Sequence, residues 1–181
     1  MTRITHLAGG ALVSTAYIGL ADISHNKVLP FYFFAGLVGS VLPDIDLFLG
    51  RRTNTSVILK HRGITHTFLF VVLCLISTIF FSEYFRNRFD FNVSFGIIFV
   101  FILGILSHFA LDLLNFEGLL FFWPISKKKF SLKLMKVGGA LEYAMVLPVL
   151  VAAALAIGYY SRFNIITRVF HIISIGSRRY D

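Results

Sequence analysis

Five apolar runs, each approaching the length needed to cross a bilayer, occupy most of this chain of 181 residues. They cover residues 7–21, 31–50, 64–82, 93–115 and 139–160. A helix needs about 20 apolar residues to cross a hydrocarbon core of roughly 30 Å. Only 14% of the residues are charged, whereas a soluble domain is about a quarter charged. We therefore predict an all-α fold, an integral membrane helical bundle of about five transmembrane helices, with residues 1–181 forming a single domain.

Two further segments are expected at the membrane surface. Residues 118–125 are apolar but too short to span, which favours a short interfacial segment. Residues 162–181 mix isoleucine and phenylalanine with four arginines and are typical of a basic amphipathic tail. The single cysteine, Cys74, lies inside an apolar run, so neither a disulfide nor a cysteine-built zinc site is expected.

The basic residues are distributed unevenly between the two sides that five spans would define. Ten lie on the side of the N-terminus: Arg3, Arg51, Arg52, Lys60, Arg62, Lys127, Lys128, Lys129, Lys133 and Lys136. Only Lys27, Arg86 and Arg88 lie opposite, apart from the four arginines of the tail. The positive-inside rule predicts that the lysine-rich side is cytoplasmic. Because this rule explains the net charge of +8, no nucleic-acid partner is expected.

Ionisable side chains lie in or beside these runs at particular depths. They are His6, Asp44, Asp46, His61, His66, His108, Asp112 and Glu142. Such groups are costly in a membrane, and by default they mark function. Along the chain they lie at the start of the first run, the end of the second, the start of the third, the end of the fourth and the start of the fifth. Successive spans alternate in direction, so we predict that the bundle gathers these groups at one end.

Local spacing favours metal binding at that end. His108 and Asp112 are four residues apart and share one helix face. Pro43 interrupts the second run, which allows Asp44 and Asp46 to point the same way. Imidazole and carboxylate ligands without sulfur suit Zn²⁺, Mn²⁺ or Fe²⁺. The number of ligands favours two or more divalent ions that share a bridging carboxylate.

Five short motifs carry a resemblance to a known family. They are THLAGG at 5–10, LPDID at 42–46, HRGITHT at 61–67, GILSHFALD at 104–112 and WP at 123–124. With these motifs in this order, the chain resembles the bacterial inner-membrane, metal-dependent hydrolases described as LexA-regulated. The resemblance implies a multi-pass protein of the bacterial inner membrane, with a metal site that faces the cytoplasm.

A more distant likeness is to the all-helical zinc-dependent phospholipase C fold, which implies zinc as the metal. It implies that Asp44 or Asp46, His61 or His66, His108 and Asp112 hold one ion. Asp112 would bridge to a second ion, which His6 also holds. That fold has a histidine four residues before its late glutamate, whereas Gly138 precedes Glu142 at that spacing. Glu142 is therefore a candidate ligand, a partner of a ligand or a base.

These observations predict a membrane-bound, metal-dependent hydrolase. A metal-activated water would cleave a phosphoester of a lipid-like substrate at the cytoplasmic membrane face. Asp44, Asp46 and Glu142 are the candidate catalytic residues, and Arg62 is the candidate for binding the substrate phosphate. Membrane lipid is the expected partner, and no obligate protein partner is inferred. The alternatives are a transporter of metal ions or protons and a non-catalytic membrane protein whose helices are stapled by metal.

Overall fold

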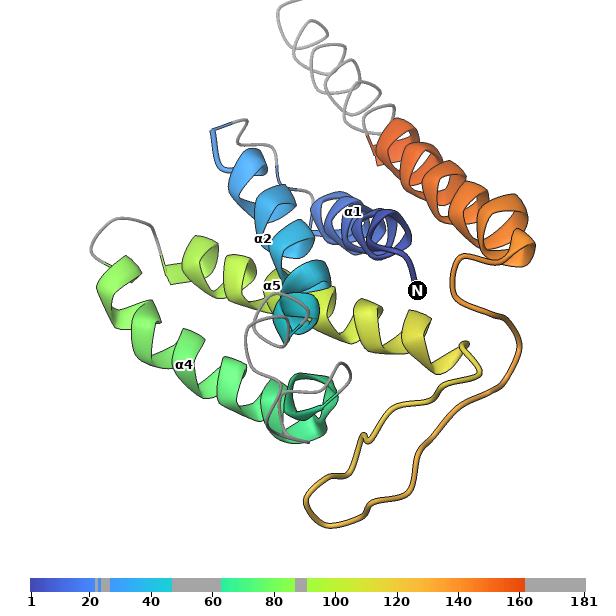
Figure 1. The fold of residues 1–181 in the computed structure, drawn as a ribbon. Helices are drawn as coiled ribbons and strands as arrows, with labels where there is room; N and C mark the ends of the chain where they lie inside the picture. Colours follow the sequence, from blue (N-terminus) through green and yellow to red (C-terminus); the bar gives the residue numbers. More distant parts are fainter. Residues whose placement is uncertain (22, 24–26, 47–62, 87–90, 162–181) are drawn as a thin grey trace, which may run out of the picture.

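A computed structural model describes residues 1–21, 23, 27–46, 63–86 and 91–161. Its helices are α1 (Arg3–Leu20), α2 (Leu29–Val41), α4 (Phe68–Arg86), α5 (Phe91–Leu113) and the helix Glu142–Ser161 (Figure 1). Within this part of the chain, strand pairing is limited to two isolated bridges, both in the loop after α5. The prediction of an all-α fold is confirmed.

The helix α5 lies at the centre of the bundle and packs against α1, α2 and α4 (Figure 1). Its side chains Val100 and Ile105 are fully buried. Glycines let the neighbouring backbones approach closely. A Cβ atom on Gly10 of α1 would lie 2.7 Å from the carbonyl oxygen of Gly36 in α2, and one on Gly104 of α5 would lie 3.1 Å from Cα of Gly39. Small residues of this kind are typical of the interfaces between closely packed membrane helices.

The helices follow the predicted apolar runs, although several ends differ: α1 begins at Arg3 instead of residue 7, and α4 spans Phe68–Arg86 instead of 64–82. The run 31–50 was expected to form one span, but α2 ends at Val41 and the chain tightens into the 3₁₀ helix η1 (Leu42–Ile45). Pro43 causes this change, because it cannot donate the hydrogen bond that a longer α-helix needs. Among the described residues, Val93–Leu113 and Glu142–Ser161 are long and apolar enough to cross a membrane, and Leu29–Ile45 and Phe68–Phe80 are shorter apolar helices. The predicted tail 162–181 lies outside the described residues.

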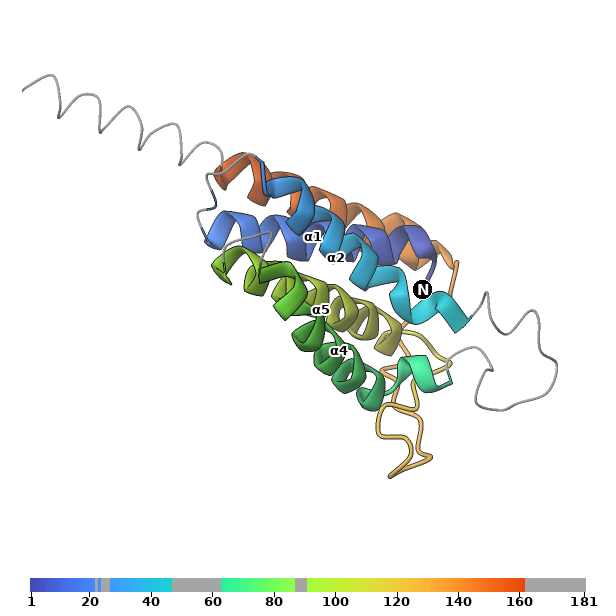
Figure 2. The ribbon, with the colours of Figure 1, turned by 90° about the vertical axis from the view of Figure 1, so that its left-hand side faces the viewer.

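Several chain segments meet at one end of the bundle. Figure 2 shows the N-terminus, η1, the 3₁₀ helix η3 (Ile64–His66) and the loop after α5 together at that end. The loop, residues 114–139, is fastened to the helix ends by its backbone. The Leu132 N–H donates to the Leu113 carbonyl at 2.7 Å, and the Phe68 N–H donates to the Phe121 carbonyl at 2.8 Å.

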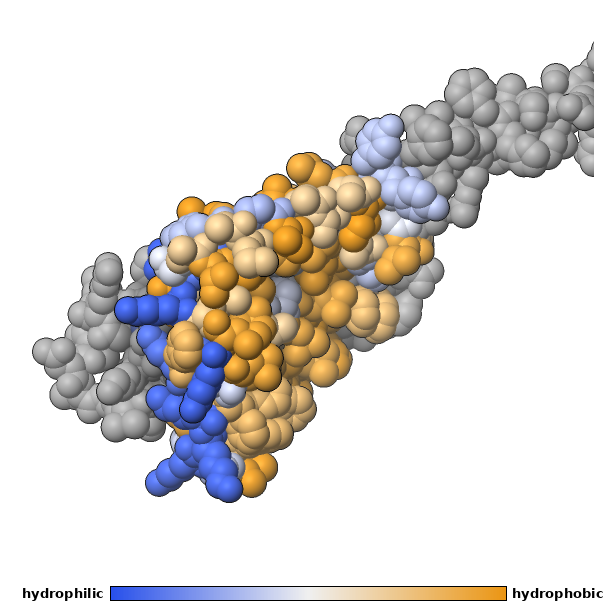
Figure 3. All heavy atoms as spheres, turned by 90° about the vertical axis from the view of Figure 1, so that its right-hand side faces the viewer, coloured by the Kyte–Doolittle hydropathy of each residue, from blue (hydrophilic) through white to orange (hydrophobic). Residues whose placement is uncertain are grey.

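The sides of the bundle are apolar, and hydrophilic residues gather at that same end (Figure 3). Large hydrophobic side chains such as Phe80 and Leu155 are mostly exposed on the helix sides. The loop 114–139 carries five exposed lysines at the hydrophilic end. This distribution is typical of a protein whose sides face lipid and whose end faces water.

Candidate metal centre

Seven of the eight predicted site residues come together inside the hydrophilic end of the bundle. Their side chains are almost completely buried, although they come from five separate parts of the chain: His6, Asp44, Asp46, His66, His108, Asp112 and Glu142. The eighth, His61, and the predicted phosphate-binding residue Arg62 lie outside the described residues.

Four ligand atoms face one another at the centre of this cluster. Nε2 of His66 lies 3.1 Å from Nε2 of His108. Oδ2 of Asp112 lies 3.6 Å and 3.7 Å from these two nitrogens, and Oδ1 of Asp44 lies 3.8 Å from each. Each of the four atoms comes from a residue that the sequence predicted as a ligand.

The backbone of α2 fixes the tautomer of His108. Nδ1 of His108 lies 2.7 Å from the carbonyl oxygen of Ser40, which can only accept a hydrogen bond. Nδ1 therefore carries the proton, and Nε2 of the neutral ring presents a lone pair. Metal-binding histidines are held in this way, with the second ring nitrogen donating to a carbonyl or carboxylate.

A threonine and the second aspartate do the same for His66. The hydroxyl of Thr65 donates to Oδ2 of Asp46 at 3.1 Å, so it accepts from Nδ1 of His66 at 3.0 Å. Nε2 of His66 is again left with its lone pair. At the start of the following helix, the hydroxyl of Thr67 accepts from the N–H of Phe70 at 3.3 Å. Asp44 thus faces the ligand atoms, whereas Asp46 supports His66 from behind.

The central group consists of two imidazole lone pairs and two carboxylate oxygens with no proton donor among these four atoms. Acceptors this close repel one another, and a cation between them removes the repulsion. Zinc bonds of about 2.0–2.1 Å in a tetrahedron give ligand–ligand edges of about 3.3 Å. The five separations that involve a histidine nitrogen, 3.1–3.8 Å, bracket that length. His66, His108 and Asp112 therefore lie close enough together to hold a divalent metal ion, and Oδ1 of Asp44 lies 3.8 Å from both histidine nitrogens.

His6 marks a second position beside the first. Its ring stacks on His108 with 3.7 Å between the ring centroids. Among the described residues, neither ring nitrogen of His6 has a hydrogen-bond partner, although both are buried. Nε2 of His6 lies 3.4 Å from Oδ1 of Asp112, the carboxylate oxygen that faces away from the central group. The atoms of His6, Asp44 and His108 also lie close enough together to share one ion.

Asp112 therefore lies between the two positions with one oxygen toward each. Its Oδ1 also accepts from Nδ2 of Asn115 at 2.9 Å and from the α-amino group of Met1. A carboxylate that bridges two ions uses its oxygens in this divided way. The bridging role that the phospholipase C likeness implied for Asp112 stays a prediction.

Glu142 has a different set of partners. Its Oε1 accepts from the backbone N–H of Thr2 at 2.6 Å and from the hydroxyls of Thr2 and Thr5 at 2.9 Å and 2.6 Å. Its Oε2 accepts from the Gly138 N–H at 2.8 Å. Among the described residues, neither group of potential ligands includes Glu142. Glu142 ties the first turn of α1, which carries His6, to the π-helical turn η4 (Glu142–Val146).

The residues predicted for the site do not include several groups that support the ligands. Ser40 contributes a backbone carbonyl, which no side-chain motif can indicate. Thr5 directly precedes His6, and Asn115 lies three residues after Asp112. Their position beside predicted ligands was the available signal.

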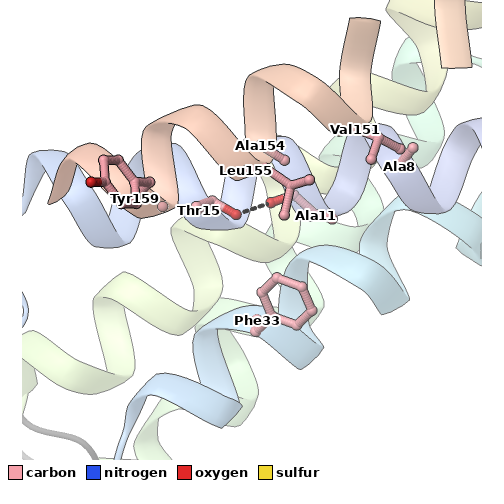
Figure 4. Close-up of a pocket in the computed structure, with 9 residues that line it drawn as sticks. Ala8, Ala11, Thr15, Phe33, Val151, Ala154, Leu155 and Tyr159 are labelled. Atoms are coloured by element: carbon pink, nitrogen blue, oxygen red, sulfur yellow. Dashed lines mark hydrogen bonds between the residues drawn. The ribbon is translucent and has the colours of Figure 1, made fainter. Parts of the chain in front are cut away.

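An apolar cavity of about 400 Å³ lies elsewhere in the bundle, between α1, α2 and the helix Glu142–Ser161 (Figure 4). Ala11 and Thr15 of α1 line one side, and Ala154 and Leu155 line the other. The Thr15 hydroxyl donates to the Ala11 carbonyl at 2.6 Å, so its polar atom is satisfied. The cavity contains no acid or imidazole and offers no chemistry of its own.

Comparison with known proteins identifies a family. No curated protein and no solved structure matches the chain significantly. The family model described as YdjM inner membrane protein matches residues 1–179. This match covers nearly the whole chain and agrees with the inner-membrane family that the motifs resemble. The chain therefore belongs to the YdjM inner membrane protein family.

Proposed function

We propose that this protein is a membrane-embedded, metal-dependent hydrolase that cleaves a phosphoester, with a lipid as the most suitable class of substrate. The observation that carries the proposal is the central group, in which two imidazole lone pairs and two carboxylate oxygens converge without a proton donor among those four atoms. A bound divalent ion supplies Lewis acidity and lowers the pKa of a water ligand to near 7.

Zinc is the ion proposed for the central position, where Asp44, His66, His108 and Asp112 would hold it. The second position would use His6 and Oδ1 of Asp112. Support for it comes from the two buried nitrogens of His6, which have no hydrogen-bond partner in the part of the chain that the structure describes. Leaving buried polar atoms unpaired is costly, so a cation there would satisfy an otherwise unfavourable group.

The other site residues are proposed to position the ligands rather than to react. Asp46 and Thr65 hold the proton on Nδ1 of His66, and the Ser40 carbonyl does so for His108. Glu142 holds the first turn of α1 and thereby His6. Of the three predicted catalytic acids, only Asp44 points at the ligand group, so we propose it as the acid closest to the reacting atoms.

A lipid substrate is proposed because of where the site lies. The five helices would form the membrane bundle, since their outward side chains are apolar along the sides. The cluster lies at the end that carries the lysine-rich loop, which the positive-inside rule assigns to the cytoplasm. A site at that depth can receive the phosphate of a lipid from the leaflet, and the predicted role of Arg62 would be to bind this phosphate.

Asp44 and Asp46 provide a matched pair that tests the metal site. The Asp44→Asn variant should lose one metal ion per chain after dialysis against zinc, because it removes a ligand. The Asp46→Asn variant should keep the ion at saturating zinc but bind it about 10–100-fold more weakly, because it removes only a supporting partner. Elemental analysis and zinc titration of the purified protein measure both effects. Full metal content in both variants would contradict the assignment.

Activity is tested on purified protein with zinc or manganese against a phospholipid panel and a generic phosphodiester. Hydrolysis should disappear in the His108→Ala variant, whose folding is checked by its melting temperature and gel-filtration profile. Undiminished hydrolysis in that variant would contradict the proposed site. Bound metal without any hydrolysis would favour the metal-stapled alternative, and zinc flux across reconstituted vesicles would favour the transporter.

A further inference from the structure

The loop 114–139 combines exposed lysines with exposed apolar side chains. All five of its lysines are exposed: Lys127, Lys128, Lys129, Lys133 and Lys136. Between and beside them, Ile125 is 93% exposed, Leu132 is 62% exposed and Leu134 is 57% exposed. Water favours the lysines and disfavours the apolar groups, so neither bulk water nor the hydrocarbon core suits the whole loop.

The interface between lipid and water satisfies both kinds of side chain. Apolar groups enter the acyl boundary there, and lysine stems extend along it while their ammonium groups stay in water. The loop contains one acid, Glu117, against five lysines, so its charge is complementary to an anionic membrane surface.

The backbone of the loop is held in place rather than hanging free. It bridges at Asn115–Met135 and at Leu119–Phe130. The Ser131 hydroxyl donates to the Asn115 carbonyl, and the side chain of Asn115 donates to Oδ1 of Asp112. The loop thus presents its lysines from a fixed frame that is connected to the candidate metal centre.

We propose that the loop 114–139 is a binding surface for anionic phospholipid headgroups, with Ile125, Leu132 and Leu134 inserted among the lipids and the lysines pairing with lipid phosphates. This surface goes beyond the proposed hydrolysis, because it acts whether or not the lipid is a substrate. It sets the depth of the candidate metal centre relative to the membrane surface.

The only tryptophan of the chain, Trp123, lies on this loop and is half-buried, so it reports on the loop without a label. The full-length protein is reconstituted in phosphatidylcholine vesicles that contain equal fractions of brominated phosphatidylglycerol or brominated phosphatidylcholine. Bromine quenches Trp123 fluorescence on contact. We expect the anionic lipid to associate at least about fivefold more strongly at low salt, as one lysine–lipid attraction already implies. The ratio of anionic to zwitterionic lipid association should fall toward one in 1 M salt, where the Debye length is about 3 Å.

The variant Lys127→Gln/Lys128→Gln/Lys129→Gln should lose most of this preference. Lys27→Gln is the control, because Lys27 is exposed in the connection between α1 and α2 at the opposite end of the bundle. It should behave as the unmodified protein does. Unchanged Trp123 emission in pure phosphatidylcholine shows that the triple variant keeps the loop conformation.

Equal quenching by the two brominated lipids at low salt would overturn the proposal, as would a preference that survives in the triple variant. Abolition of the preference by a short single-stranded oligonucleotide, at a phosphate concentration far below that of the anionic lipid, would assign the surface to nucleic acid and overturn it as well. The measurement needs neither metal nor hydrolysis, so its failure is distinguishable from failure of the proposed function.

Discussion

The two faces of α1 differ sharply in how they pack. Toward α2 and α5, Gly10 brings the backbones into close contact and His6 stacks on His108. Toward the helix Glu142–Ser161, small residues such as Ala11 line a cavity of about 400 Å³. The most apolar stretch of that helix contains no buried residue, whereas 39% of the corresponding stretch of α5 is buried.

This difference shows which helix contacts determine the position of the candidate metal centre. Small residues occur on both faces of α1, but the face toward α2 packs more closely: a Cβ on Gly10 would lie 2.7 Å from the Gly36 carbonyl oxygen, whereas one on Gly19 would lie 3.1 Å from Cβ of Ser161. The face toward α2 and α5 also carries a candidate ligand, whose position depends on the distance between backbones. The other face contacts the helix Glu142–Ser161 toward the C-terminal end of α1, where a Cβ on Gly158 would lie 3.3 Å from Cγ2 of Thr15. The closely packed face is therefore the one that holds the candidate metal centre.

The largest effect is expected from removing metal, which acts only on the closely packed face. Binding at a thousandfold excess over the dissociation constant stabilises a folded state by about 4.1 kcal/mol. Chelation of the zinc-loaded protein should therefore lower its melting temperature strongly, as measured by thermal unfolding in detergent. The Asp44→Asn variant should show little response to the chelator. An equal response in both proteins would show that the stabilising ion binds elsewhere.

Replacing Gly10 by leucine should cause the second-largest loss of stability. A Cβ added at this position would lie 2.7 Å from the Gly36 carbonyl oxygen, so a leucine side chain must push α1 and α2 apart. Overpacking of this kind costs about 3 kcal/mol. Unfolding experiments in detergent measure the loss, and zinc affinity should fall together with stability because His6 moves with α1. Unchanged zinc affinity would separate helix spacing from the site.

A smaller effect is expected from changing Thr5, whose hydroxyl links α1 to Glu142 at the start of the helix Glu142–Ser161. Thr5→Val removes one hydroxyl donor from the buried Glu142 carboxylate and keeps the shape of the side chain. Hydrogen bonds to charged groups contribute about 1.5 kcal/mol or somewhat more. The unfolding free energy should fall by this amount, and Thr5→Ser should retain most of it. A Thr5→Ser variant as unstable as Thr5→Val would point to packing instead.

The smallest effect is expected at Ala11, the residue that follows Gly10 and lines the cavity. Ala11→Leu places its extra atoms in empty apolar space, so stability should change by no more than about 0.5 kcal/mol. Comparison of its unfolding with that of Gly10→Leu measures the asymmetry of α1 directly. Equal destabilisation by the two leucines would mean that both faces are packed alike.

Helical periodicity and span direction predict much of this arrangement from the sequence. The pairing of His108 with Asp112 follows from their spacing, and the gathering of distant ligands follows from the alternation of the helices. The distinct positions of Asp44 and Asp46 do not follow, because the turn η1 decides which carboxylate faces inward. The bond between Thr5 and Glu142 joins residues 137 positions apart, and no local pattern encodes it. The cavity is also unpredictable, because it depends on how the small side chains of α1 and of the helix Glu142–Ser161 leave space between them.

The position of Asp112 has a consequence for how the two candidate positions fill. One side chain serves both, so an ion that fixes the Asp112 carboxylate at the first position also orients its other oxygen for the second. The second ion then meets a ligand whose rotational freedom has already been lost. Occupation of the central position should therefore strengthen binding at the second position.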